Sequence, residues 1–157
     1  MNEPEVQVDI IRDDSSRLPE AARLLAEFLG VEVVSGFEGL LARYVASGSY
    51  EVLLAREAAR CCGVLTLSYR PALSVGGELA ALEDLYVEPE HRRRGVGAVL
   101  VRAAHDRLRK RSVSYVEVQI SGMGAVGFYE SLGYEVESGV RVLSSSLPLG
   151  GGVADPG

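Results

Sequence analysis

Residues 82–111, LEDLYVEPEHRRRGVGAVLVRAAHDRLRKR, combine three kinds of local pattern. The first part, 82–87, is short, mostly apolar and rich in strand-forming residues. The middle part, 88–97, contains Pro89, three consecutive arginines and two glycines, a composition typical of a loop. From 98 to 111 the apolar residues recur at helical spacing. The stretch therefore predicts a strand, a glycine-bearing loop and a helix in succession.

A strand, loop and helix in this order can form an anion-binding site. The first turn of a helix leaves four backbone N–H groups without partners, and phosphate oxygens can accept hydrogen bonds from them. Gly95 and Gly97 allow the backbone to turn and to approach a ligand without Cβ clashes. An exposed helix dipole stabilises an anion by only ~0.3–1 kcal/mol, whereas a hydrogen bond to a charged group contributes ~1.5–3 kcal/mol. Converging N–H groups would therefore contribute more to pyrophosphate binding than the dipole.

The glycine spacing distinguishes this loop from two common phosphate loops. No G-x-x-x-x-G-K-S/T occurs, and G-x-G-x-x-G fails because position 100 is Leu. The pattern present is Arg92-x-x-Gly95-x-Gly97, after a strand that ends at Val87. It resembles the acetyl-CoA signature of the GNAT superfamily of N-acyltransferases, Gln/Arg-x-x-Gly-x-Gly/Ala. The alternative is a helix N-terminus with an exposed arginine cluster and no ligand.

A second motif follows at 125–134, AVGFYESLGY, and is similar to the second GNAT signature, A-x-x-F-Y-x-x-x-G-F/Y. On the expected helix, Phe128 and Leu132 lie one turn apart and can pack on the core, while Tyr129 points about 100° away. The alternative is an amphipathic helix whose tyrosine only covers the core. One position departs from the pattern, because many relatives carry Asn where this sequence has Gly122.

The resemblance implies an α/β fold with a central mixed sheet of about six to seven strands, flanked by about four helices. The expected single domain spans residues 1–147, and a glycine-rich tail at 148–157 is expected to be disordered. Strands are predicted at 6–10, 50–56, 63–69, 78–87 and 114–120, with a final hairpin of 134–137 and 140–147. Helices are predicted at 19–29, 40–45, 98–111 and 125–132.

Acetyl transfer to an amine needs a base, an acid and an oxyanion donor, because an aliphatic amine with a pKa near ~10.4 is mostly protonated at neutral pH. The resemblance implies that Tyr129 is the acid, close to the cofactor sulfur, and that the Val87 N–H is the oxyanion donor. Glu83 is the expected base, acting through a water, and Asp84 is its rival. Neighbouring strand residues face opposite sides unless a bulge intervenes. The carboxylate could instead bind the acceptor's charge or pair with an arginine.

The expected cofactor-binding residues are Leu85, Tyr86, Val87, Arg92, Arg93, Arg94, Gly95, Val96, Gly97 and Ala98.

Charge is distributed unevenly along the chain of 157 residues, whose formal net charge is −6. Eight of the sixteen Lys and Arg residues lie within 92–111, opposed there only by Asp106, so this window carries about +7 and the remainder about −13. A positive window at the proposed phosphate site suits an anionic cofactor. The acidic remainder and the lack of aromatic residues among the arginines argue against a nucleic-acid binder, and the acidic surface suits a cationic acceptor.

The cysteines and histidines predict no metal site. Cys61 and Cys62 are adjacent, so on a strand they would point to opposite faces. His91 and His105 are expected to be a solvated loop residue and a surface residue. We expect a cytoplasmic protein without membrane contact. The two cysteines are not expected to form a disulfide, and the sequence shows no signal peptide and no apolar run of membrane-spanning length.

The sequence thus predicts an N-acetyltransferase that moves an acetyl group from acetyl-CoA to a primary amine by direct attack in a ternary complex. The expected acceptor is a small cationic molecule, polyamine-like or aminoglycoside-like. A protein amine is an alternative acceptor, and a non-catalytic acyl-CoA-binding sensor is an alternative function that Gly122 keeps open. A homodimer is a possible assembly, because relatives in the superfamily are often dimers.

Overall fold

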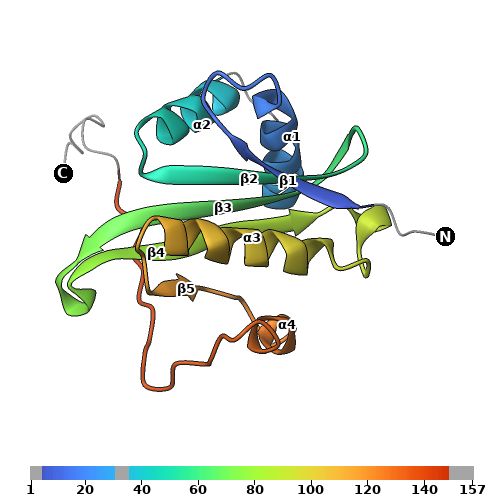
Figure 1. Ribbon diagram of the computed structural model, residues 1–157. Helices are drawn as coiled ribbons and strands as arrows, with labels where there is room; N and C mark the ends of the chain where they lie inside the picture. Colours follow the sequence, from blue (N-terminus) through green and yellow to red (C-terminus); the bar gives the residue numbers. More distant parts are fainter. Residues whose placement is uncertain (1–4, 31–35, 149–157) are drawn as a thin grey trace.

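The computed structural model describes residues 5–30 and 36–148. Its centre is a mixed sheet with the strand order β1-β2-β3-β4-β5 (Figure 1). Neighbouring strands are antiparallel except for β4 and β5, which run parallel. The strands are β1 (Val6–Ile11), β2 (Tyr50–Glu57), β3 (Arg60–Ala72), β4 (Gly77–Val87) and β5 (Val116–Val118).

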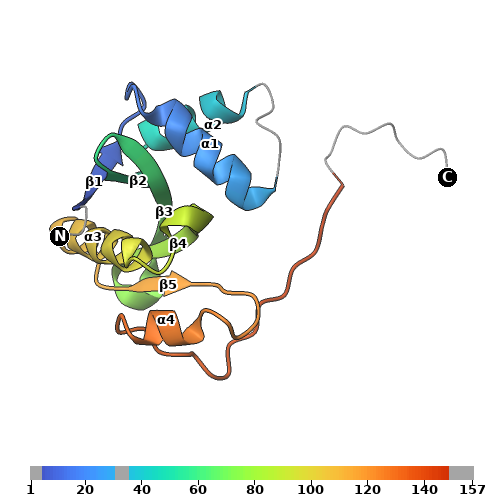
Figure 2. The same cartoon turned by 90° about the vertical axis from the view of Figure 1, so that its right-hand side faces the viewer.

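Helices cover both faces of the sheet (Figure 2). On one face lie α1 and α2, and on the other lies α3, which provides the crossover between the parallel strands β4 and β5. The helices are α1 (Leu18–Leu29), α2 (Phe37–Ala46), α3 (Val96–Lys110) and α4 (Val126–Glu130), with short 3-10 turns η1 (Leu73–Val75) and η2 (Pro89–His91). Within the described ranges, no helix combines the length and the apolar character that crossing a membrane requires.

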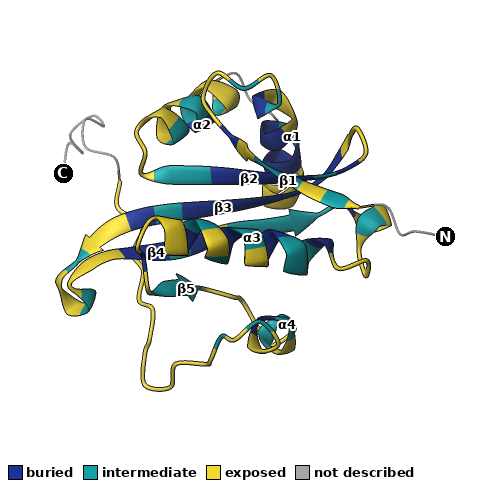
Figure 3. Cartoon of the chain, viewed as in Figure 1, coloured by how far each residue is buried: buried dark blue, intermediate teal, exposed yellow. Residues whose placement is uncertain are grey.

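Two apolar clusters hold these layers together, one on each face of the sheet. Alternate residues of β2 and β3 point to opposite faces, so Val52 and Leu54 pack with α1, while Leu53 and Leu65 pack with α3. Because both faces are covered, the middle of β2 is a continuous apolar run instead of an alternating one. Figure 3 shows this pattern as buried central strands under partly exposed helices.

The structure confirms the mixed α/β sheet with four helices but corrects the strand count, which is five within the described residues. The predicted hairpin of 134–137 and 140–147 is wrong, because neither segment forms a strand. The apolar residues that suggested it, Val136, Val140 and Val142, are 58–68% exposed. The neighbouring strand β5 has only three residues, so it offers a short edge for pairing. Residues 149–157, most of the predicted tail, lie outside the described residues.

Helix α3 packs closely against the sheet at Gly63 of β3. A Cβ added there would lie 3.1 Å from Leu100 Cδ1, 3.2 Å from Val96 Cγ1 and 3.3 Å from the Tyr86 carbonyl oxygen. A Cβ at this position would therefore require its neighbours on α3 or β4 to shift by a few tenths of an ångström.

We expect Gly63→Ala to lower the free energy of unfolding by about 1–3 kcal/mol, the usual cost of overpacking a core. Urea denaturation followed by circular dichroism measures the effect. Gly77→Ala is the control, because a Cβ at Gly77 meets no atom within 4 Å. Equal stability of the two variants would contradict the tight packing of α3 on β3.

Candidate functional site

The two parallel strands at the centre of the site separate after a short contact. Strand β5 pairs with β4 only at Ala80, Ala81 and Leu82. Beyond Leu82, β4 continues to Val87 and stays paired on its other side with β3. The edge of β4 from 83 to 87 that faces away from β3 therefore has no strand partner within the described part of the chain.

The polar backbone groups of Leu85 and Val87 point toward this uncovered edge. Gly63 pairs with Val87, and the Glu88 N–H donates to the Cys62 carbonyl oxygen at 2.8 Å. That bond identifies Gly63–Val87 as a non-hydrogen-bonded pair of the antiparallel ladder, so the N–H and C=O of Val87 face away from β3. The same alternation turns Leu85 outward. An extended ligand could therefore pair with this edge like an added strand.

The first turn of α3 adjoins this edge and carries unused donors. The backbone N–H groups of residues 93–98 have no acceptor among the described residues, and the first bond of the helix runs from the Val99 N–H to the Gly95 carbonyl oxygen at 3.0 Å. Gly95 has φ +79 and Arg93 has φ +63. Positive φ suits Gly95 but costs a non-glycine residue roughly 1–2 kcal/mol. The loop is therefore held in a conformation that leaves its donors free.

The three arginines of the loop have different surroundings. Arg92 donates from Nε to the Val87 carbonyl oxygen at 2.9 Å, with its guanidinium 5.7 Å from the Tyr86 ring centroid. Arg94 pairs with Glu57 at 3.4 Å. Arg93 is exposed and, among the described residues, pairs with no carboxylate. Arg93 is therefore the arginine of this loop that is most available to an anionic ligand.

Helix α4 closes the side of the loop. A Cβ built on Gly97 would lie 3.4 Å from Phe128 Cζ and 4.0 Å from Leu85 Cδ2. Gly97 thus faces the narrow space where α3, β4 and α4 meet. A longer side chain at this position would fill that space.

Tyr129 follows Phe128 on α4 and has a largely buried ring with a free hydroxyl. Its ring packs edge-on against Phe128 and Tyr134, with centroids 5.0 and 5.3 Å apart, and the residue is 7% exposed. The hydroxyl has no hydrogen-bond partner among the described residues. Burial raises the pKa of Tyr129, so the hydroxyl stays protonated at neutral pH. A protonated, uncommitted hydroxyl can act as a donor.

Tyr129 also lines a cavity of about 700 Å³ between β5, α4 and residues 132–142. Its wall includes Gly122 and Met123 but no residue of the glycine loop. The structure therefore connects Tyr129 with the loop through the contact between Phe128 and Gly97, and not through one continuous cavity.

A β-bulge in β4 changes the expected directions of the two carboxylates. Thr66 pairs with Asp84 and the next residue of β3, Leu67, pairs with Leu82, so Glu83 is the extra residue. Thr66 Oγ1 donates to Asp84 Oδ2 at 2.5 Å, and Ser68 Oγ donates to Glu83 Oε1 at 2.6 Å. Thr66 and Ser68 lie two residues apart on one face of β3. Both carboxylates therefore lie on the face of the sheet that α1 and α2 cover.

Their surroundings differ. Asp84 is half-buried, and its Oδ2 also accepts a bond from the Tyr50 hydroxyl at 3.2 Å. Burial, with a further contribution from the Asp84 carboxylate, raises the pKa of Tyr50 to about 12, so this hydroxyl remains a donor. Glu83 is exposed and has the single bond from Ser68. Asp84 is thus held in place by two hydroxyl donors, whereas Glu83 retains acceptor capacity for a water or an amine.

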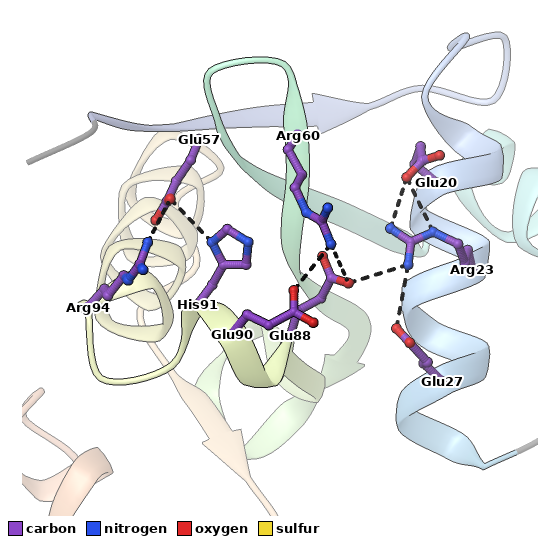
Figure 4. A network of polar contacts seen from close by, with 9 residues as sticks. All are labelled: Glu20, Arg23, Glu27, Glu57, Arg60, Glu88, Glu90, His91 and Arg94. Atoms are coloured by element: carbon purple, nitrogen blue, oxygen red, sulfur yellow. Dashed lines mark hydrogen bonds and ion pairs between the residues drawn. The ribbon is translucent and has the colours of Figure 1, made fainter.

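A polar network beside the loop was not foreseen from the sequence. Glu88 is 7% exposed, its Oε2 lies 3.6 Å from both Arg23 of α1 and Arg60 of β3, and its Oε1 is buried without a partner. Figure 4 shows Glu88 between the two guanidinium groups. The network connects the start of the glycine loop with α1 and with the β2–β3 hairpin. No sequence motif predicts this network, because Arg23, Arg60 and Glu88 are far apart in the sequence.

Taken together, the residues present fit a long anionic ligand such as acetyl-CoA. The free N–H groups of residues 93–98 suit a pyrophosphate. The outward N–H and C=O groups of Leu85 and the outward N–H of Val87 suit an amide-bearing arm, while the Val87 carbonyl oxygen already accepts a bond from Arg92. The contribution of each residue to binding stays a prediction.

Comparisons with known proteins agree with this geometry. A family model described as the acetyltransferase (GNAT) family matches residues 19–134. An uncharacterized N-acetyltransferase of Methanocaldococcus jannaschii is 35% identical over 66 residues, which are 41% of this chain and 29% of that protein. A ribosomal protein bS18-alanine N-acetyltransferase of Escherichia coli is 39% identical over 57 residues, or 35% of this chain and 38% of that protein. The aligned parts are therefore well under half of these curated relatives.

Solved structures share the fold over nearly the whole chain. An aminoglycoside acetyltransferase from an uncultured soil metagenomic sample, solved with trehalose, has a TM-score of 0.78 at 21% identity and covers 91% of this chain and 97% of its own. A ribosomal-protein-alanine N-acetyltransferase of Brucella melitensis has a TM-score of 0.72 at 19% identity, with 90% and 100% covered. At such identities the likeness establishes the arrangement of helices and strands.

Proposed function

The chain belongs to the GNAT acetyltransferase family, and from this premise we propose that it transfers an acetyl group from acetyl-CoA to the primary amine of a small cationic molecule. The observation that carries the proposal is the run of free backbone N–H groups at residues 93–98 beside the uncovered edge of β4. Residues 1–147 act as one domain in this proposal. The reaction is a direct transfer, in which the amine nitrogen bonds to the acetyl carbonyl carbon and the carbon–sulfur bond of the thioester breaks.

Each step in which the protein takes part has a candidate group. Glu83, through a water, accepts the proton that the ammonium must lose before the nitrogen can attack. The N–H of Val87 lies on the uncovered edge and donates to the oxyanion. Tyr129 donates a hydrogen bond to the leaving sulfur, for which its raised pKa is suitable because the hydroxyl stays protonated.

The acceptor class is inferred from charge. Glu83 and Asp84 place two carboxylates on one face of the sheet, in a chain whose residues outside 92–111 carry a net charge of about −13. A molecule with two or more ammonium groups would match both carboxylates, whereas a single amine would leave one unmatched. The aminoglycoside acetyltransferase among the fold neighbours acts on an acceptor of this class.

A protein N-terminus is the second candidate acceptor. The sequence relative from Escherichia coli that acetylates an alanine of ribosomal protein bS18 supports it. Such an acceptor carries one reacting amine on a peptide backbone. It would therefore use one of the two carboxylates, together with contacts between the enzyme and the peptide that follows the amine.

The test is release of free CoA thiol from acetyl-CoA with a panel of amines: spermidine, kanamycin, and a peptide with N-terminal alanine. We expect turnover with at least one polyamine or aminoglycoside and little with the peptide. If only the peptide is acetylated, a protein N-terminus and not a small cationic molecule is the acceptor. Tight acetyl-CoA binding without turnover on any amine would favour a non-catalytic acyl-CoA sensor.

The two carboxylates should differ in their effects on kinetics. We expect Glu83→Gln to lower kcat about 100-fold at pH 7, within the usual contribution of a general base. The loss should shrink near pH ~10.4, where about half of the amine is already deprotonated. Asp84→Asn, the matched control, should mainly raise the KM for the amine, because it removes a fixed charge. Steady-state kinetics at both pH values measure this, and a Glu83→Gln deficit that does not depend on pH would exclude the base role.

A further inference from the structure

Three side chains of the types that ligate metals meet beside the glycine loop. They come from the end of β2 (Glu57), from β3 (Cys62) and from η2 (His91). Glu57 Oε2 lies 3.2 Å from His91 Nδ1, and the ligand atoms of all three residues lie within 4.8 Å of one another. Figure 4 shows Glu57 and His91 pointing toward each other, with Arg94 beside them.

These residues form a cluster that is largely shielded from solvent and not a surface patch. Glu57 and Cys62 are buried, and the side chain of His91 is 12% exposed. The neighbouring cysteine has a different environment, because Cys61 belongs to the apolar cluster under α1 and its sulfur accepts a weak bond from Arg17. Only one of the two adjacent cysteines is thus placed for ligation.

A set of one thiolate, one imidazole and one carboxylate is typical of zinc. Tetrahedral zinc with bonds of about 2.0–2.3 Å holds its ligand atoms roughly 3.3–3.8 Å apart. The separations here, up to 4.8 Å, are therefore within reach of small side-chain rotations. We propose that Glu57, Cys62 and His91 form a zinc site that fastens the glycine loop to the β2–β3 hairpin.

The three residues already make contacts within the protein that bonds to an ion would replace, among them the 3.2 Å contact between Glu57 and His91. Arg94 pairs with Glu57 at 3.4 Å, but its side chain is 54% exposed, so it can rotate into solvent and open a route for the ion. Cys62 Sγ donates to the Ala55 carbonyl oxygen at 3.6 Å, a long contact that the ion would replace. Burial raises the pKa of the Cys62 thiol to about 11. Zinc binding therefore displaces the thiol proton of Cys62. This proton leaves to solvent as the zinc–sulfur bond forms.

Binding at this site also affects the loop. An ion on Glu57 would neutralise the charge that holds Arg94, and it would hold His91 of the loop in place. Arg94 precedes Gly95 in the loop, so its released guanidinium would add an unpaired positive charge to the loop. The zinc site itself does not depend on the proposed acetyl transfer.

The experiment uses untagged protein without acetyl-CoA, titrated with Cd²⁺ as a zinc surrogate and then with Zn²⁺ in competition with a chromophoric chelator. The wild type and Cys61→Ser should bind one equivalent with a thiolate-to-metal charge-transfer band. Cys62→Ser should lose that band and bind Zn²⁺ at least about tenfold more weakly, a loss of ~1.4 kcal/mol. The adjacent cysteines make this a matched comparison within one strand.

His91→Gln provides a second test of zinc binding. His91 lies in the loop, where a substitution disturbs the core less than a substitution at Cys62. It should keep the band and weaken Zn²⁺ binding at least about tenfold. An unchanged affinity in both Cys62→Ser and His91→Gln, or a wild type without a charge-transfer band, would overturn the site.

Discussion

Gly97→Glu should abolish acetyl-CoA binding while the domain stays folded. Gly97 faces the space between Phe128 and Leu85, so a glutamate would fill it and place a negative charge where the pyrophosphate is expected. The helix itself should tolerate the change, because glutamate has a better helix propensity than glycine and a favourable charge for a first turn. We expect affinity to fall at least about 100-fold, or ~2.7 kcal/mol.

Isothermal titration calorimetry with acetyl-CoA measures this affinity, and circular dichroism checks the fold. Gly97→Ala is the control, since its Cβ would make ordinary contacts at 3.4 Å and beyond. It should bind within a few-fold of the wild type. Retained affinity in a folded Gly97→Glu protein would show that the cofactor lies elsewhere.

Tyr129→Phe should lower kcat about 100-fold and leave the affinity for acetyl-CoA nearly unchanged. The phenylalanine ring keeps the edge-on contacts with Phe128 and Tyr134, so only the unpartnered hydroxyl is lost. A positioned proton donor typically contributes 10²–10⁴-fold. Because burial raises the pKa of Tyr129, its ionisation should not reduce the wild-type rate between pH 7 and about 10.

Tyr134→Phe is the matched control for this prediction. Tyr134 is a neighbouring tyrosine whose hydroxyl lies 2.9 Å from His105 Nε2. Its loss should cost about 0.5–1.5 kcal/mol of stability, the usual value of one hydrogen bond, with little change in kcat. If Tyr129→Phe keeps full turnover, or if both variants lose turnover equally, Tyr129 is not the specific donor.

Much of this architecture follows from local patterns in the sequence. Alternating apolar residues at 6–10 and the helical spacing at 98–111 predicted β1 and α3, because each element turns one side toward an apolar cluster of the core. The glycines of the loop predicted a turn into a helix N-terminus, and Gly95 has the positive φ that such a turn needs.

Other features depend on register and on contacts between distant segments. The bulge at Glu83 arises from the pairing of β3 with β4, so the sequence of β4 alone left open which carboxylate faces the acceptor side. The cluster of Glu57, Cys62 and His91 joins three elements and has no recognisable spacing. Conversely, Val140 and Val142 alternate as in a hairpin strand, but they remain exposed and form no strand beside the three-residue β5.

The claim that the backbone at the start of α3 binds acetyl-CoA can be tested directly by nuclear magnetic resonance of the ¹⁵N-labelled protein. Addition of acetyl-CoA should shift the amide signals of residues 93–98 most strongly, followed by those of Leu85 and Val87, whose N–H groups face the uncovered edge. Saturable binding with the largest shifts elsewhere, and with the signals of residues 93–98 unchanged, would contradict the account.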